Sequence, residues 1–171
     1  PRTAGFNTAN LTLLSEVGQM LIIILMLIGG SPGSTAGGMK TTTLAVLVSS
    51  ALSVFRKKEH TNFFGRQIPD GTIRNAATIF LMYIVLFLVG GMVISRTEDI
   101  PLMTALFETA SAIGTVGLSL GITPDLGIVS HIILICLMFF GRVGGLTLIF
   151  ATISEKKPNG SKYPQEKITV G

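Results

Sequence analysis

Long apolar runs alternate with short polar segments along the chain, and the length of each run indicates what it can form. Residues 76–95 and 126–153 are each long enough for one helical crossing of a lipid bilayer, which takes about 20 residues. The runs 17–28 and 44–55 are too short to cross alone, but together they predict one crossing with an interruption. The run 101–113 is also too short to cross. The pattern therefore predicts an all-α membrane protein.

The run 101–113 and the residues after it predict a helix that enters the membrane and turns back. Pro101 suits the first turn of a helix and Asp99 can cap it. Such a helix would be roughly 20 Å long, about half the thickness of a membrane. Residues 114–117 follow and read Gly-Thr-Val-Gly, and non-helical backbone is tolerated at this depth only where protein covers it or water reaches it. We interpret 101–119 as a pore helix and filter; an ordinary buried helix and turn is the alternative.

The chemistry of this segment suits a cation filter. The C-terminal end of a helix carries partial negative charge, which favours a cation. Rings of backbone carbonyl groups replace the water shell of potassium in ion filters. Thr-Val-Gly is a short motif and is weak evidence when it stands alone. The prediction is therefore that backbone carbonyl groups of this segment face a water-filled path.

The interruption between the first two apolar runs is rich in residues that stop helices. Five glycines and Pro32 lie within residues 29–38. The segment also approaches the phosphate-binding pattern Gly-x-x-x-x-Gly-Lys-Ser/Thr, but Met39 separates Gly38 from Lys40. A membrane NTPase with a phosphate loop at 33–41 is therefore kept as an alternative.

Composition and charge agree with a membrane protein. Of the 171 residues, 48% are hydrophobic and 13% are charged, and the mean hydropathy of +0.65 excludes an ordinary soluble domain. The net charge of +4 comes from basic blocks within 56–74 and 156–167 rather than from one basic face. Short basic loops favour the cytoplasmic side of a membrane. The loop 56–75 and the tail 154–171 are therefore predicted to be cytoplasmic, in a multi-pass protein of the cell (plasma) membrane.

The chain contains an internal repeat. Residues 3–35 and 115–147 can be compared without a gap, and glycine and polar identities recur at one constant offset. These identities are Thr3/Thr115, Gly5/Gly117, Gly29/Gly141, Gly33/Gly145 and Thr35/Thr147. The chain is therefore interpreted as one and a half copies of a unit built as helix, re-entrant loop and helix.

Four segments resemble the Trk/Ktr/HKT superfamily of potassium transporters. They are residues 3–8 (Thr-Ala-Gly-Phe-Asn-Thr), 29–43, 114–119 and 141–144. The resemblance covers essentially the whole chain, and the glycine-rich segment 29–43 is its most specific element. Within the superfamily, the chain is most similar to the membrane, ion-translocating subunit of the bacterial Ktr system, as a C-terminal fragment of it.

The resemblance implies four helix–pore loop–helix units around one pore. Residues 1–55 would supply the filter and the broken last helix of the third unit, with an intramembrane gating loop at 29–43. Residues 76–153 would form the fourth unit, with a helix at 76–95, the pore helix and filter at 101–119 and a helix at 126–153. The implied partners are the missing N-terminal half of the same protein, a second copy in a homodimer, membrane lipid and a cytosolic ring of nucleotide-binding regulatory subunits. No nucleic acid is expected, and nucleotide would act only through the regulatory partner.

The resemblance also implies a potassium ion at the filter and an intramembrane gate. Sodium as a coupling ion is left open. The filter residues would be Thr3, Ala4, Gly5, Phe6, Gly114, Thr115, Val116, Gly117 and Leu118. The gate residues would be Gly29, Gly30, Ser31, Pro32, Gly33, Ser34, Thr35, Ala36, Gly37, Gly38, Lys40 and Arg142.

Two charged residues each allow two interpretations. Arg142 lies too deep in its predicted helix to reach water by extension alone, so it is either a positive barrier in the pore or an arginine bonded to loop carbonyls, and these roles are compatible. Glu108 either adds negative potential near the ion path or bonds backbone, and the structural role is favoured. The sequence offers no nucleophile–base pair, so an enzyme is not expected. A non-conducting scaffold subunit is a further alternative, for which a hydrated glycine-rich break would have no purpose.

Overall fold

The computed structural model describes residues 4–8, 10–57, 60–63 and 65–143, and the described part is almost entirely helical. Its elements in chain order are the 3-10 helix η1 (Leu11–Leu13), α1 (Glu16–Leu27), α2 (Thr41–Phe55), β1 (Asn62–Phe63), β2 (Arg66–Gln67), α3 (Asp70–Glu98), α4 (Leu102–Gly114), the 3-10 helix η2 (Thr123–Asp125) and α5 (Ile128–Val143).

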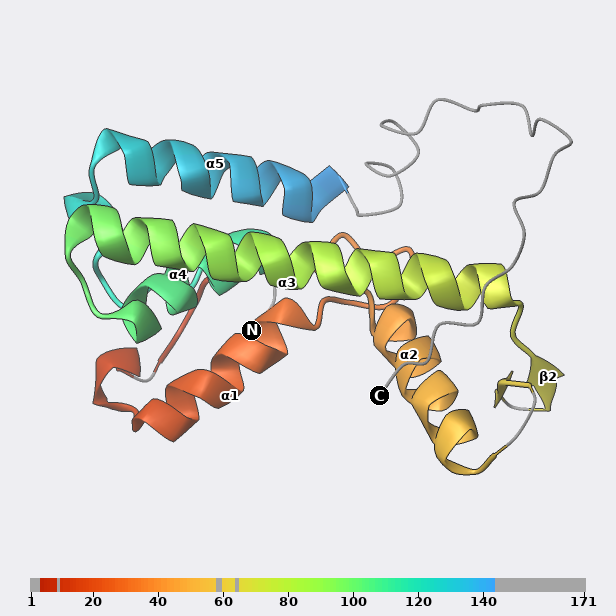
Figure 1. The fold of residues 1–171 in the computed structure, drawn as a ribbon. Coiled ribbons are helices and arrows are strands. Elements are labelled where there is room, and N and C mark those ends of the chain that lie inside the picture. Colours follow the sequence, from red (N-terminus) through yellow and green to blue (C-terminus); the bar gives the residue numbers. More distant parts are fainter. Residues whose placement is uncertain (1–3, 9, 58–59, 64, 144–171) are drawn as a thin grey trace, which may run out of the picture.

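The long helix α3 organises the arrangement of the other helices. Figure 1 shows α5 lying along α3, with α1 and α2 on the opposite side. The short helix α4 packs against α1, α3 and α5 at one end of the array, while α2 packs against α3. The segment between α1 and α2 therefore lets two consecutive helices pack against different partners.

α4 is the most enclosed helix of the described chain. Phe107 and Ile113 are fully buried, and the residues from Phe107 to Gly114 are buried without exception. The polar side chain of Thr109 bonds within the helix, because its hydroxyl donates to the carbonyl of Leu106 at 3.0 Å. Because its C-terminal half is covered on all sides, α4 places its C-terminal end in the interior of the protein.

α3 is longer than the predicted helix at 76–95, and its end corrects one prediction. Among the described residues it is the one helix long and apolar enough to cross a membrane. The prediction that Asp99 caps the next helix was wrong. Asp99 is the C-cap of α3, at φ 52° and ψ 40°, and its amide donates to the carbonyl of Ser95. Aspartate tolerates this left-handed conformation, so it can end one helix where a cap for the next was expected. Pro101 lies immediately before α4, and no side-chain cap precedes that helix.

The elements recur at the offset found in the sequence. η1 begins at Leu11 and η2 at Thr123, and α1 begins at Glu16 and α5 at Ile128, so both pairs keep the offset that separates Gly5 from Gly117. The copies differ at their ends, because α1 stops at Leu27 whereas α5 continues through Gly141 to Val143. The final run was predicted at 126–153; its residues 144–153, and the tail 154–171, lie outside the described residues.

The basic segment 56–75 contains a small hairpin that the sequence pattern did not indicate. β1 and β2 pair antiparallel, with Asn62 opposite Gln67, and Gly65 at φ +76° lies between the strands. Strands of two residues are too short to show alternation, so hydrophobic periodicity carries no signal for them.

Gly141 is predicted to be irreplaceable in the crossing of α5 over the end of α4. A methyl group at Gly141 would lie 2.0 Å from the Ile113 carbonyl oxygen, so Gly141→Ala should lower the free energy of unfolding by about 3 kcal/mol. Gly18→Ala is the matched control, because its nearest neighbour would be 3.5 Å away and alanine favours a helix by about 1 kcal/mol over glycine. Thermal unfolding of the detergent-solubilised protein measures both. Equal melting temperatures for the two variants would contradict this packing.

Candidate functional site

The C-terminal end of α4 makes an abrupt turn with two backbone hydrogen bonds. Thr115 adopts the left-handed conformation, at φ 50° and ψ 40°. Its amide donates to the carbonyl of Ala112 at 3.1 Å, and the amide of Val116 donates to Ser111 at 2.9 Å. This pair of bonds is the Schellman arrangement, which reverses the chain at the end of a helix. The chain therefore leaves α4 through this turn, and the predicted filter residues after Thr115 lie outside the helix.

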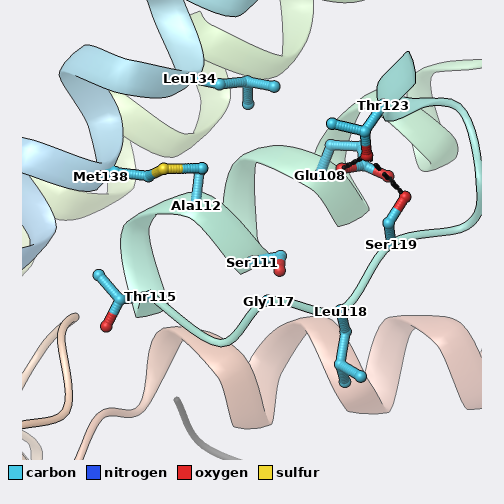
Figure 2. Close-up of a pocket in the computed structure, with 10 residues that line it drawn as sticks. All are labelled: Glu108, Ser111, Ala112, Thr115, Gly117, Leu118, Ser119, Thr123, Leu134 and Met138. Atoms are coloured by element: carbon cyan, nitrogen blue, oxygen red, sulfur yellow. Dashed lines mark hydrogen bonds between the residues drawn. The ribbon is translucent and has the colours of Figure 1, made fainter. Parts of the chain in front are cut away.

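The two predicted filter segments come together at their glycines. Gly5 and Gly117 both have positive φ, at +67° and +85°. A methyl group at Gly5 would lie 2.9 Å from the carbonyl oxygen of Gly117, so neither position has room for a side chain directed at the other. Val116 and Leu118 are buried while Gly117 between them is exposed, and Leu118 points toward α1 in Figure 2. The segment therefore turns its side chains into the protein and leaves backbone uncovered at the glycine.

A buried carboxylate holds the chain just after the filter glycine. Glu108 accepts hydrogen bonds from the hydroxyl of Ser119 at 2.5 Å, from the amide of Leu120 at 3.2 Å and from the hydroxyl of Thr123 at 3.1 Å. Figure 2 shows the three side chains converging. These bonds join α4 to the loop that follows it and to η2. The sequence had suggested backbone as a partner of Glu108 but named no residue. The serine and threonine carried no recognisable spacing, so the signal was absent from the sequence.

The glycine-rich segment after α1 folds back on the end of that helix. The amide of Gly29 donates to Met39 at 2.6 Å, and the amide of Met39 donates to Leu27 at 3.2 Å, so Ile28 and Met39 form a parallel bridge. A methyl group at Gly29 would lie 2.3 Å from the Gly37 carbonyl oxygen. Residues 31–33 are exposed and form a turn in which the Ser34 amide donates to the Ser31 carbonyl at 3.0 Å. We refer to residues 29–40 as the glycine-rich loop.

Two cationic side chains bind consecutive carbonyl groups of the glycine-rich loop. The Lys40 ammonium donates to the carbonyls of Ser34 at 3.0 Å and Ala36 at 2.8 Å. The guanidinium of Arg142, from α5, donates to the carbonyl of Thr35 between them. Both cations therefore bind backbone oxygens of the loop. For Arg142 this is one of the two roles considered from the sequence, an arginine bonded to loop carbonyls.

The loop lies directly against the filter turn and α5. The amide of Gly37 donates to the hydroxyl of Thr115 at 3.0 Å, and the amide of Gly38 donates to the carbonyl of Gly141 at 3.2 Å. A methyl group at Gly37 would lie 2.9 Å from the carbonyl oxygen of Ile113. The described members of the predicted filter and the predicted gate thus form one contiguous site; Thr3 lies outside the described residues.

The loop does not have the geometry of a phosphate cradle. The amides of Gly37, Gly38 and Met39 all donate to oxygens of the protein, and the Lys40 ammonium is bound to carbonyls of its own loop. A phosphate loop instead presents free amides and a free lysine to its ligand. The arrangement therefore does not favour the NTPase alternative.

A cavity of about 320 Å³ lies beside the filter turn, between α4 and α5. Its wall combines the polar groups of Ser111 and Thr115 with the apolar side chains of Leu134 and Met138, as Figure 2 shows. Within the described part of the chain, His, Cys, Asp and Glu side chains form no cluster of three that could hold a metal ion. The carboxylate of Glu108 also lines this cavity.

The comparisons with known proteins decide the family. A family model described as "TrkH: Cation transport protein" matches residues 1–162. The chain belongs to the TrkH family of cation transport proteins. This agrees with the resemblance drawn from the sequence motifs and with the prediction that the chain is not an enzyme.

Two proteins that are similar in sequence to this chain are named as uptake proteins. The chain is 41% identical over 177 residues to the potassium/sodium uptake protein NtpJ of Enterococcus hirae, covering 100% of this chain and 39% of the relative. It is 36% identical over 171 residues to the Ktr system potassium uptake protein B of Bacillus subtilis, covering 100% of this chain and 38% of the relative. The chain therefore spans about two fifths of the length of these relatives.

A solved structure has the same fold. The potassium transporter TrkH from Vibrio parahaemolyticus superposes with a TM-score of 0.74 at 23% identity, over 89% of this chain and 34% of that one. The helical arrangement is therefore that of a TrkH transporter. The family and the apolar helix α3 together support a location in a membrane.

Glu108 is predicted to stabilise the loop after the filter glycine. Glu108→Ala removes the acceptor for three donors and should lower the free energy of unfolding by about 2 kcal/mol. Glu108→Gln keeps one carbonyl acceptor and should lose less. Glu16→Ala, at an exposed acid in the first turn of α1, is the control and should cost below about 1 kcal/mol. Thermal unfolding in detergent ranks the three, and a loss for Glu16→Ala as large as for Glu108→Ala would contradict the stabilising role of Glu108.

Proposed function

We propose that the chain forms part of a potassium-selective pore in which backbone carbonyls of residues 3–6 and 114–118 coordinate the ion. The observation that carries this proposal is the contact between Gly5 and Gly117, two positive-φ glycines from equivalent places in the repeat that meet at the end of a buried short helix. The names of the two relatives, which refer to potassium and to potassium/sodium uptake, point to the same ion.

The physical argument concerns the backbone. Glycine reaches positive φ without steric cost, so carbonyl groups beside it can turn toward a common axis. The exposed Gly117, with buried side chains on both sides, leaves backbone oxygens as the groups available to a cation. The negative end of α4 adds favourable potential at this place. Potassium loses its water shell to such oxygens, and its selection depends on the number and direction of the carbonyl dipoles.

The glycine-rich loop and Arg142 are proposed as the gate of this pore. The loop contacts the filter turn through Gly37 and Thr115, and this contact supports a gate next to the proposed filter. Lys40 and Arg142 add two positive charges that are bound to its carbonyls. An ion leaving the filter would approach these two positive charges, which is unfavourable while the loop stays in place.

The complete pore would need further segments. Two filter segments supply half of a four-unit cage, so we propose that this chain works together with an N-terminal half of the same protein, as a homodimer in the plasma membrane. The loop 56–75 and the C-terminus would face the cytoplasm and a ring of nucleotide-binding regulatory subunits. Sodium as a coupling ion remains part of the proposal, and the domain boundaries are those given by the sequence motifs.

Gly117→Ser is expected to reduce the preference for potassium over sodium about tenfold in the complete transporter, the equivalent of one lost dipole of about 1.4 kcal/mol. The side chain would strain a backbone at φ +85° and would approach the Cα atom of Gly5 at 3.3 Å. Gly121→Ser is the matched control, since Gly121 has φ +95° but nothing within 4 Å of an added methyl group. Potassium and sodium uptake, measured side by side in uptake-deficient cells, separate the two variants. The filter assignment fails if both variants discriminate like the parent at normal membrane abundance.

Deletion of residues 31–36 is expected to raise potassium flux several-fold, because it removes the carbonyls that hold Lys40 and Arg142 under the filter. Arg142→Ala should act in the same direction by removing a positive charge from the path. Arg96→Ala, at an exposed residue in the last turn of α3, is the control and should leave flux unchanged. Flux into liposomes gives the measurement, and lower or equal flux in both folded variants would refute the gate.

A further inference from the structure

Thr115 has a backbone conformation that is costly for its residue type. Its φ of 50° is left-handed, and a β-branched side chain is strained there. Glycine or asparagine usually occupies this position at the end of a helix, because it avoids the strain. A glycine at 115 would end α4 as well and at lower cost. The threonine therefore calls for a reason outside the helix cap.

The hydroxyl of Thr115 has a partner far away in the sequence. It accepts a hydrogen bond from the amide of Gly37 at 3.0 Å, so the filter turn is joined to the glycine-rich loop. The fit around this bond is close, because a methyl group at Gly37 would lie 2.7 Å from the Thr115 hydroxyl oxygen. Both the loop residue and the filter residue are thus specialised for one contact: Gly37 by having no side chain, and Thr115 by keeping a hydroxyl in a strained turn.

The remaining attachments of the loop lie elsewhere. Gly38 is bonded to Gly141 of α5, Thr35 receives Arg142, and Lys40 binds carbonyls of the loop itself. The bond to Thr115 joins the loop to the segment proposed to hold the ion. If the loop moves out of the proposed ion path, this bond must break. If the filter turn changes its conformation, the loop must shift with it.

We propose that Thr115 is a positioning residue whose hydroxyl docks the glycine-rich loop beneath the filter through the Gly37 amide, and so couples the position of the loop to the conformation of the filter. This inference rests on the proposed function, in which the glycine-rich loop is the gate. The side-chain hydroxyl serves the loop and not the ion. The backbone of Thr115 keeps its place among the filter carbonyls.

The test follows the position of the loop directly. Ala36 is buried next to Gly37, so a cysteine at this site becomes accessible to a thiol reagent only when the loop moves away from the filter turn. The parent is the complete transporter with Ala36→Cys and Cys136→Ser, since Cys136 is exposed and would react. The labelling rate with a methanethiosulfonate reagent in membranes is measured together with potassium flux.

Thr115→Val keeps the branched shape but removes the acceptor, and it should raise both the labelling rate and the flux by about fivefold, the shift expected for one neutral hydrogen bond. Thr115→Ser keeps the hydroxyl and should label like the parent. Gly37→Ala is an independent second variant that should also accelerate labelling, because its methyl group would meet the Thr115 hydroxyl and the Ile113 carbonyl. If Thr115→Val does not reach the membrane, the labelling rate of Gly37→Ala tests the proposal instead.

Labelling of Thr115→Val and Gly37→Ala at the parent rate, at normal membrane abundance, overturns the proposal. A loss of potassium selectivity in Thr115→Val without faster labelling also overturns it, since the hydroxyl would then serve the ion path. Faster labelling in both, with rescue by serine, supports it. A parent that carries no potassium flux would refute the proposed function, and the labelling rates would still decide the role of Thr115.

Discussion

The end of α4 inside the protein is the constraint on which the described structure depends. A helix that stops away from water leaves carbonyl groups of its last turn without helical partners. Ser111 and Ala112 are satisfied by the turn that follows, and the Ile113 carbonyl is approached by backbone at Gly37 and Gly141. Only residues without a Cβ atom fit at these two places, so the loop after α1 and the path of α5 are both adapted to the end of one short helix.

Much of this arrangement could be predicted because its signals are local or periodic. Apolar runs predicted the helices, and glycine and threonine residues that recur at one constant offset linked Gly5 to Gly117. The structure repeats η1 as η2 and the start of α1 as that of α5 at the same offset. A repeat constrains the fold strongly, since each copy must satisfy the same local backbone requirements.

The contacts between segments could not be predicted in the same way. The residues that pair with Glu108, and the bond from Gly37 to the distant Thr115, depend on which amide meets which oxygen after packing. Asp99 was assigned to the wrong helix because its side chain suits both a cap and a left-handed C-cap. The residue type limits which conformations and hydrogen bonds a position can adopt, and tertiary packing determines which of them forms.

The cations bound to the glycine-rich loop show what such packing would contribute to the proposed pore. Lys40 and Arg142 bind three consecutive carbonyls, at Ser34, Thr35 and Ala36. Lys40 is partly buried, and a charge removed from water is costly unless polar groups solvate it. Backbone carbonyls are also the groups that replace water around potassium in a filter. In the proposed pore, tethered cations therefore occupy the oxygens that a passing ion would use, and they repel it as well. In this proposal, moving the loop away would remove both obstacles at once, so one displacement of the glycine-rich loop would change the proposed pore from closed to open.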